Sequence, residues 1–568
     1  MPVIVFVIVI LTAASARAGG VIDFGDADEF TISQPTVQTQ VGTFDTFLNE
    51  YLLDTGASGI LVGSSASDEL TGLGLQTVAT YTDYGVAGPE TTRVAAPYDF
   101  HYAGSDGVPL TLPNTRIQTS KGDFSFYSGI AGMPLMMNRT VGINLAAQAD
   151  MNALQIGVSF GAGPPPTAGR QYSVPLNLVE FPQSGQTNPG DPLPVSAPLP
   201  FVPVQVSAGS HRLAGSFLLD TGAQQCILSS QAAFDLGLDT NGNGTFDDEA
   251  TSFQTVAGVG GSVQIPVLAV DAVALRAAGG VDLSFGHVAV GIVDIDPSIS
   301  GVLGMNMLNT GWEMYALNTF LGMDPGPPGV FDRVDLDFRN AAATMQGELR
   351  LTMNGERFAT SGWAVAAGTT LTLGPQVPAT VASLANNGLI DVGTATLTVA
   401  VGLSGLTLQN QIAAGFGDGS WNGTSGITSS AAAAMPYRAV GWVDNDDGSV
   451  TVGFAAEGDT NLDGLVDLGD LQNILASGKY GTGTGAVWSD GDFNLDGAVN
   501  LSDLQDVLAS GLYGQGGYRS RSLSRLALAD PSGAGLLAGA ITPVPEPAPW
   551  MLGATAAAWL ASRCRRRR

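Results

Sequence analysis

Two stretches of this chain are nearly identical: Tyr51-Leu-Leu-Asp-Thr-Gly-Ala-Ser58 and Phe217-Leu-Leu-Asp-Thr-Gly-Ala-Gln224. Each is an apolar run that ends in Asp-Thr-Gly-Ala, which is typical of a buried strand followed by a sharp turn. The likeness continues downstream, because Gly129-Ile-Ala-Gly-Met133 corresponds to Gly301-Val-Leu-Gly-Met305. We therefore predict two similar lobes built from β-strands.

The paired aspartates, Asp54 and Asp220, indicate the chemistry of this repeat. Two carboxylates that converge in a cleft cannot both ionise readily, so the pair holds one proton over a wide pH range. The ionised carboxylate can accept a proton from an attacking water while the protonated one polarises an amide carbonyl. A lone Asp-Thr-Gly often marks only a turn. The duplication favours peptide hydrolysis that uses no metal or other cofactor for catalysis.

At these residues the chain resembles the aspartic proteases, in the two-lobed arrangement of pepsins but with Asp-Thr-Gly-Ala motifs closer to those of retropepsins. The resemblance covers about residues 21–338 and implies a mainly β, two-lobed acid-protease barrel fold. It implies that Asp54 and Asp220 are the catalytic dyad and that the substrate is a protein or peptide. The glycines after each aspartate allow the turn, and the threonines can hydrogen-bond across the interface. The residues that support the dyad are therefore Thr55, Gly56, Thr221 and Gly222.

Ala57 and Ala223 are the main departure from pepsins, which usually carry a Ser or Thr at this position. The hydroxyl of that residue supports the ionised carboxylate. Without it the charged form is disfavoured, and the pKa values of the dyad should rise. We therefore predict a working range at weakly acidic pH.

The resemblance also implies a β-hairpin flap that closes over the substrate. The candidates are residues 81–88, in which Tyr84 could cover the substrate, and residues 256–261 in the second lobe. An ordinary hairpin turn with a surface tyrosine is an equal alternative.

A second duplication lies near the C-terminus. Asp459-x-Asn-x-Asp-Gly-x-Val-Asp-x-x-Asp470 returns as Asp492-x-Asn-x-Asp-Gly-x-Val-Asn-x-x-Asp503. Each copy spaces its oxygen-bearing side chains as a twelve-residue calcium loop does, with Gly at position six for the turn and a backbone carbonyl at position seven. The predicted Ca²⁺ ligands are Asp459, Asn461, Asp463, Leu465, Asp467 and Asp470 in the first copy, and Asp492, Asn494, Asp496, Ala498, Asn500 and Asp503 in the second.

An apolar helical stretch follows each loop, at residues 471–475 and 504–508. Together with Asp at position twelve, this layout makes residues 458–514 resemble a type I dockerin. The resemblance implies a small α-helical module with structural Ca²⁺ that binds a cohesin-like or other surface protein. Leu468-Gly469 and Leu501-Ser502 replace the Ser/Thr pair that many cohesins read, so the class of partner stays open.

Both ends of the chain carry sorting features. The apolar run from Val3 to Ala14, followed by Ala16-Arg17-Ala18, predicts a signal peptide. Residues 544–568 combine Pro-Glu-Pro, an apolar stretch and a run of arginines, and resemble the PEP-CTERM signal of bacteria. That signal implies exosortase-type processing; a plain short membrane tail is the alternative. We expect an exported protein at the cell envelope or outside the cell, with a transient C-terminal membrane anchor.

The composition agrees with a β-rich, acidic protein. Against 51 Asp and Glu the chain has 22 Lys and Arg, a formal net charge of −29, which excludes nucleic acid as a partner. The 76 glycines and only 13% charged residues favour turn-rich β structure. Cys226 and Cys564 are the only cysteines, so disulfides do not hold the fold, and we expect Cys226 to be a small buried residue.

Two functions follow from this organisation. The first is an exported aspartic endopeptidase tethered by its dockerin. The second is a non-catalytic surface or matrix protein whose lobes are a binding scaffold and whose dockerin assembles a polysaccharide-degrading complex. The presence of both aspartates favours the first. The predicted order is a signal peptide (1–18), lobe 1 (21–160), a Pro-rich connection (161–200), lobe 2 (201–340), a β-rich module (347–456), the dockerin (458–514), a linker (515–543) and the sorting signal (544–568).

Overall fold

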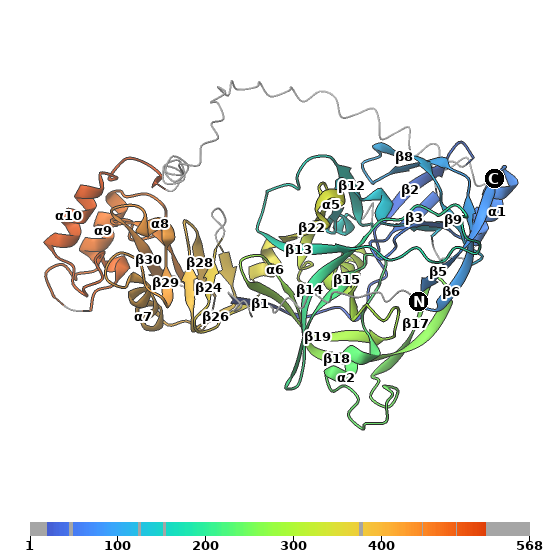
Figure 1. Cartoon of the computed structure of the whole chain (residues 1–568). Helices are drawn as coiled ribbons and strands as arrows, with labels where there is room; N and C mark the ends of the chain where they lie inside the picture. Colours follow the sequence, from blue (N-terminus) through green and yellow to red (C-terminus); the bar gives the residue numbers. More distant parts are fainter. Residues whose placement is uncertain are drawn as a thin grey trace, which may run out of the picture. The chain divides into compact units, whose positions relative to one another are not determined.

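The computed structural model describes residues 20–44, 49–122, 127–150, 155–359, 361–373, 379–400, 402–445, 447–483 and 485–518. The predicted signal peptide, most of the linker and the sorting signal lie outside these ranges. The described chain is mainly β, as predicted (Figure 1). No helix in these ranges is long and apolar enough to cross a membrane.

The first Asp-Thr-Gly copy belongs to a nine-stranded sheet with the order β5-β6-β9-β4-β10-β3-β2-β7-β8. Alternate residues are buried in β2, as expected when one face packs on a core, whereas every residue of β4 and β10 is buried. The strands are β2 (Thr36–Val41), β3 (Asn49–Leu53), β4 (Ile60–Val62), β5 (Thr77–Gly85), β6 (Gly88–Ala95), β7 (Tyr98–Ala103), β8 (Pro109–Thr115), β9 (Gln118–Thr119) and β10 (Gly129–Ala131).

The second copy belongs to a fifteen-stranded sheet. Within it, β15 and β20 run parallel, and β16 pairs antiparallel with β20. The strands are β1 (Gly20–Asp26), β11 (Thr140–Asn144), β12 (Gly157–Gly161), β13 (Gln171–Val179), β14 (Leu199–Ala208), β15 (His211–Leu219), β16 (Cys226–Leu228), β17 (Ser252–Gly258), β18 (Gly261–Arg276), β19 (Val281–Ile292), β20 (Gly301–Leu303), β21 (Phe331–Asp337), β22 (Gln346–Met353), β23 (Gly362–Val365) and β26 (Ser383–Asn386).

The two copies share one local topology. In the first sheet β10 lies between β3, to which it is parallel, and β4, to which it is antiparallel. In the second sheet β20 has the same relation to β15 and β16. The apolar runs before each aspartate are buried, with Leu53 and Leu219 both 0% exposed. The repeated sequence therefore gives repeated structure.

The sheet boundaries differ from the predicted domain boundaries. Strands β1 and β11–β12, which we predicted as part of lobe 1, pair with β19 and β21 in the fifteen-stranded sheet. The predicted Pro-rich connection (161–200) is more than a linker, because β13 lies within it and pairs with β14 and β22 in the fifteen-stranded sheet. Later in the connection, Gly185 accepts a hydrogen bond from Thr82 N in β5 (2.7 Å). These pairings join residues far apart in sequence, which local patterns do not encode.

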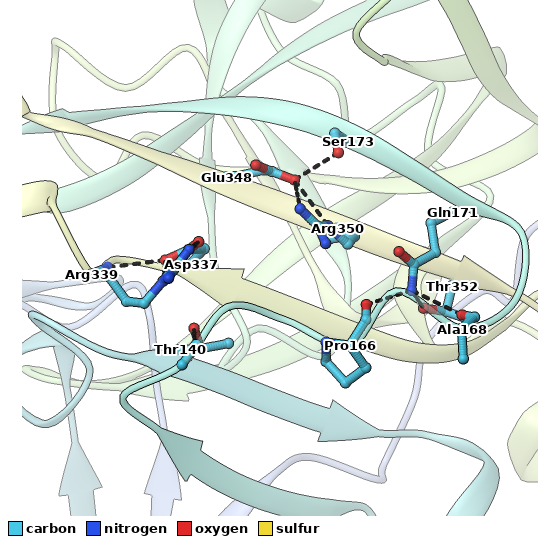
Figure 2. A network of polar contacts seen from close by, with 11 residues as sticks. Thr140, Pro166, Ala168, Gln171, Ser173, Asp337, Arg339, Glu348, Arg350 and Thr352 are labelled. Carbon is cyan, nitrogen blue, oxygen red and sulfur yellow. Dashed lines mark hydrogen bonds and ion pairs between the residues drawn. The ribbon is translucent and has the colours of Figure 1, made fainter. Parts of the chain in front are cut away.

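Polar side chains cover the outer face of this sheet where β13, β21 and β22 lie side by side (Figure 2). Buried Leu349 and Leu351 alternate along β22 with Glu348 and Arg350, as the two-residue period of a strand requires. Arg350 Nη2 donates to Glu348 Oε1 at 2.8 Å, and Ser173 Oγ donates to the same oxygen at 2.6 Å. Pairs at the protein surface contribute only about 0–1 kcal/mol even when they are partly buried like this one, so burial of the leucines dominates.

Beyond β22, in the segment predicted as a β-rich module (347–456), the chain forms two small sheets accompanied by helices. A three-stranded sheet holds β24 (Thr370–Thr372), β27 (Leu389–Asp391) and β29 (Gly426–Thr428), and a four-stranded sheet holds β25 (Ala379–Val381), β28 (Thr396–Val399), β31 (Val450–Ala456) and β30 (Arg438–Asp444). Helix α7 (Gly405–Phe416) packs against β29. The remaining helices are α1 (Ser64–Gly72), α2 (Ser230–Asp235), α3 (Met305–Leu308), α4 (Trp312–Phe320), α5 (Ala341–Thr344), α6 (Gly355–Ala359), α8 (Ser430–Ala433), α9 (Leu468–Ala476), α10 (Leu501–Ser510), and the 3₁₀ turns η1 (Met133–Leu135), η2 (Ala146–Ala149) and η3 (Trp488–Asp490).

Helices α9 and α10 follow the two twelve-residue segments, and this C-terminal region packs on the preceding module. The Trp488 side chain is fully buried, and there is no room beside it for a Cβ at Gly441 in β30. Tyr518 is also fully buried, and its ring lies 6.2 Å from that of Phe454 in β31. The segment 458–514 therefore shares a core with residues before it.

Candidate active site

Each Asp-Thr-Gly loop begins where a buried strand ends. Asp54 follows β3, and its N–H donates to Ala131 O at 3.1 Å; Asp220 follows β15, and its N–H donates to Leu303 O at the same distance. Behind the loops, a Cβ at Gly132 would lie 2.3 Å from Ala57 O, so only glycine allows this close approach. Gly304 is also crowded, since a Cβ there would lie 2.6 Å from Gln225 O of the second loop.

The two loops are joined by a reciprocal hydrogen-bond network of the two threonines. Thr55 N donates to Thr221 Oγ1 (3.1 Å), and Thr221 N donates to Thr55 Oγ1 (3.0 Å). Each hydroxyl donates in turn to the opposite strand end, Thr55 to Leu219 O and Thr221 to Leu53 O, both at 2.6 Å. Both threonines are 0% exposed. Buried, fully partnered groups of this kind hold the two loops in one register.

This register brings the two aspartates together. Their carboxyl groups share a hydrogen bond. Each carboxyl group also lies against the glycine of the opposite loop, since a Cβ at Gly56 would be 2.5 Å from Asp220 Cγ and one at Gly222 would be 2.5 Å from Asp54 Cγ. Residues separated by more than 160 positions in sequence thus form one site, and the glycines are needed because a side chain would displace the carboxylates.

The environment raises the pKa of both carboxyl groups. Burial is the largest cause for Asp54, and the negative charge of Asp220 adds to it, so the pKa of Asp54 lies well above its usual value. Burial also raises the pKa of Asp220, opposed by hydrogen bonds from Asp54 and from the N–H groups of Gly222 and Ala223. The Ala223 N–H donates to Asp220 Oδ1 at 3.0 Å. The pKa values of the dyad are raised, as the sequence predicted. The main cause is desolvation by burial, whereas the sequence-based argument rested on the missing hydroxyl at Ala57 and Ala223.

Both flap candidates are hairpins, and their tips touch. The first is β5–β6, with Gly85 opposite Gly88, and the second is β17–β18, with Gly258 opposite Gly261. A Cβ at Gly85 would lie 2.6 Å from Val259 Cβ, and Gly260 N donates to Glu90 Oε2 at 3.4 Å. Tyr84 lies in the first hairpin with 68% of its surface exposed. Its role as a substrate cover stays a prediction.

Sequence reasoning missed Gln34. Its side-chain amide donates to Gly222 O, and its Oε1 accepts from Tyr127 Oη at 3.2 Å. Thr31 N nearby donates to Gln224 O at 3.0 Å. Residues 31–34 therefore run beside the second Asp-Thr-Gly loop. No motif marks them, because the contact exists only in the folded chain.

In the twelve-residue segments, each copy folds around its own first aspartate. Gly464 N donates to Asp459 Oδ2 (3.0 Å), and Gly497 N donates to Asp492 Oδ2 (2.9 Å). The last aspartate of each segment bonds backbone amides of the same segment: Asp470 accepts from Thr460 N and Asp467 N, and Asp503 accepts from Phe493 N and Asn500 N. These contacts also cap the N-termini of α9 and α10.

The twelve-residue segments offer a set of oxygen donors to Ca²⁺. Asp459 is 0% exposed, yet its Oδ1 has no hydrogen-bond partner, and burial raises the pKa of Asp459 and of Asp492 to about 6. A buried carboxylate oxygen without a partner is costly unless a cation offsets it. In the described ranges, however, no group of three or more His, Cys, Asp or Glu side chains is close enough to hold a metal ion by those side chains alone. Calcium loops also use amide and backbone oxygens. The donor set therefore fits Ca²⁺.

Part of the chain matches a known protease family. Residues 202–307 match the family described as aspartyl protease, a range that includes Asp220 but not Asp54. Among solved structures, the aspartic proteinase from Irpex lacteus is similar at 12% identity and a TM-score of 0.32, covering 57% of this chain and 97% of that chain. No curated protein matches the chain.

Proposed function

We propose that this protein is an exported aspartic endopeptidase, with Asp54 and Asp220 as its catalytic dyad. The observation that carries the proposal is the shared hydrogen bond between the two carboxyl groups, in loops held together by Thr55 and Thr221. The aspartyl protease match over residues 202–307 supports the same reaction.

The geometry suits general acid–base hydrolysis of a peptide bond. Because the two carboxyl groups are half-buried and adjacent, one stays protonated while the other ionises. The ionised carboxylate removes a proton from water as the oxygen attacks the amide carbonyl, and the protonated carboxyl group donates a hydrogen bond to the carbonyl oxygen. The proton then passes to the leaving nitrogen, and both carboxyl groups return to their starting state.

The two hairpins suit the role of a cover for the substrate. Because their tips touch, a peptide that passes between the two hairpins requires β5–β6 and β17–β18 to separate. Tyr84 in β5 is the side chain that we propose covers the bound substrate.

Casein cleavage between roughly pH 3 and 7, where a carboxylate dyad titrates, tests the proposal. We expect wild-type cleavage that a pepstatin-type inhibitor blocks and that Asp54→Asn and Asp220→Asn each abolish. Asp106→Asn, in an exposed turn, is the matched control. Cleavage that survives either dyad substitution contradicts the assignment.

We further propose that residues 458–514 bind Ca²⁺ and attach the enzyme to a cohesin-like or other surface protein. The unpartnered Asp459 Oδ1 supports the cation. Equivalent leucines of the two repeats support a protein partner, because they are exposed on α9 and α10: Leu468 (60%), Leu475 (74%), Leu501 (61%) and Leu508 (75%). Location at the cell envelope and exosortase-type processing at residues 544–568 belong to the same proposal and rest on the sequence.

A further inference from the structure

The backbone around Gln34 is fixed to both halves of the candidate site. Three residues before it, Thr31 N donates to Gln224 O at 3.0 Å, directly after the second Asp-Thr-Gly loop. One residue after it, Pro35 O accepts from Leu53 N at 2.9 Å, at the end of β3. The Gln34 side chain therefore starts from a defined position between the two loops.

This side chain holds one peptide unit of the second loop. The Gln34 amide donates to Gly222 O. The N–H of the same peptide unit belongs to Ala223 and donates to Asp220 Oδ1 at 3.0 Å. Because a trans peptide is planar, with its C=O and N–H on opposite sides, a group that holds the carbonyl also sets the direction of the N–H. Gln34 thus directs an N–H group at the carboxyl group of Asp220.

The orientation of the Gln34 amide is fixed as well. Gly222 O can only accept a hydrogen bond, so it must face the NH₂ group of the amide. The other end of the amide, Gln34 Oε1, accepts from Tyr127 Oη at 3.2 Å. A row of hydrogen bonds therefore runs from Tyr127 through Gln34 and the held peptide unit to Asp220. Each bond in such a row polarises the next, and an N–H group that bonds a carboxylate favours its ionised form.

The corresponding segment of the other half carries no such amide. There Ala197 N donates to Ser58 O at 2.8 Å, which repeats the bond that the segment before Gln34 makes to the second copy. Two and three residues later this segment has Leu199 and Pro200, whose side chains contain no hydrogen-bond donor. The two carboxyl groups of the dyad come from a repeat, yet Gln34 makes their surroundings different.

The titratable side chains around this row of hydrogen bonds are Asp28, Glu50, Asp54, Tyr127 and Glu313. Asp54 shares a hydrogen bond with Asp220, so its proton is directly linked to the charge of Asp220. Burial raises the pKa of Tyr127, and the charge of Glu50 adds to this, so the Tyr127 hydroxyl remains a donor at acidic and neutral pH. Glu313 accepts from the N–H next to Gln34, that of Ser33.

We propose that Gln34 is a positioning residue that favours ionisation of Asp220, so that Asp220 is the base of the dyad and Asp54 holds the proton. Asp220 then takes a proton from the water whose oxygen bonds to the carbonyl carbon, and Asp54 gives its proton to the carbonyl oxygen. When the C–N bond breaks, Asp220 passes its proton to the nitrogen and Asp54 regains one from a hydroxyl of the intermediate. The inference rests on the proposed peptidase function and assigns the two roles, which the repeated sequence leaves open.

Stability as a function of pH tests the positioning role without relying on cleavage. The full-length wild type and Gln34→Leu are unfolded in urea between roughly pH 3 and 7, and the same pair is compared in the Asp220→Asn background. Only an ionised Asp220 gains from the directed N–H. The stability lost in Gln34→Leu should therefore grow as the pH rises through the titration of Asp220, and should not change with pH in Asp220→Asn. A loss of equal size at every pH in both backgrounds overturns the inference.

Two further variants complete this experiment. Gln38→Leu removes an exposed glutamine of β2 and is the matched control, which should show no loss that depends on pH. Tyr127→Phe removes the hydroxyl that orients the Gln34 amide and should give a smaller loss with the same dependence on pH. If Gln34→Leu does not fold, Tyr127→Phe decides the question, and a loss that is constant with pH overturns the inference.

The pH profile of cleavage separates this inference from the proposed function. For a short peptide that the wild type cleaves, the acidic limb of kcat/KM should move upward by about 0.5–1 pH unit in Gln34→Leu, since the ionised base loses a hydrogen-bonded partner. KM should change by less than about twofold, because the substrate contacts remain. An unmoved acidic limb, in an enzyme whose cleavage depends on the dyad, overturns the role of Gln34 alone. Absence of dyad-dependent cleavage overturns the peptidase, and the urea experiment then decides separately whether Gln34 acts on Asp220.

Discussion

The molecule contains two duplicated acidic motifs, and the copies behave differently. The Asp-Thr-Gly copies meet: Thr55 and Thr221 exchange hydrogen bonds, and Asp54 and Asp220 share one site. The twelve-residue copies each close on themselves, since the carboxylates of Asp459 and Asp470 bond amides of their own segment. One duplication therefore makes a single composite site, whereas the other makes two separate local ones.

The difference has a thermodynamic consequence. Groups that share contacts are coupled, so substitutions in both copies do not add, whereas substitutions at independent sites do. A substitution in either Asp-Thr-Gly copy should therefore remove the catalytic activity of the whole site. A substitution in one twelve-residue copy should remove Ca²⁺ binding by that copy and leave the other copy intact.

The largest expected effect is on catalysis. Asp54→Asn and Asp220→Asn should each lower kcat by ~10²–10⁴-fold, because each removes one partner of the proposed general acid–base pair. The double variant should be no worse than either single one, since the residues act as a unit. Peptide cleavage in single-turnover experiments checks this. Losses that multiply would indicate two independent sites.

The contrasting prediction concerns calcium. The wild type should bind two Ca²⁺ ions, Asp459→Ala and Asp492→Ala one each, and the double variant none. Isothermal titration of the full chain measures the stoichiometry, and Asp418→Ala, an exposed turn residue, is the control. Loss of both ions in either single variant would show that these copies are coupled after all. Chelation with EDTA should lower the unfolding temperature of the wild type but not of the double variant.

A smaller effect is expected from the threonines. Thr55→Ala leaves the buried Thr221 N–H without its acceptor and should lower the free energy of unfolding by about 1–3 kcal/mol. Thr55→Ser keeps the hydroxyl and should cost less. Urea unfolding of Thr55→Ala, Thr221→Ala and the double variant measures the coupling energy between them. Strict additivity would contradict a shared network.

The smallest effect is on the pH dependence of stability. Because the pKa of Asp54 is raised in the folded state, its contribution to stability is complete below its usual pKa and is lost as the pH rises through the raised value. Asp54→Asn should therefore match the wild type in stability at acidic pH and exceed it, by on the order of 1 kcal/mol, near neutral pH. Thermal unfolding across this pH range checks the sign. A stability gap that closes as pH rises would contradict the raised pKa.

Sequence and structure agree best where contacts are local. The apolar runs before each aspartate and the helices after each twelve-residue segment could both be predicted, since each depends on neighbours within a few residues. Cys226 is buried, as expected, and burial raises the pKa of its thiol to about 12. The domain boundaries are harder to predict from the sequence, because β1 and β11 pair with β19 and β21, which lie far downstream in the chain.

By itself, the sequence determined that two Asp-Thr-Gly strands and two Asp-rich loops exist, because a strand, a turn and a ligand spacing are properties of short segments. Only the tertiary structure decided that the aspartates share a hydrogen bond, that the hairpin tips touch and that Gln34 reaches the second loop. Those features require contacts between residues distant in the chain, and their formation depends on how the whole core packs rather than on any local pattern.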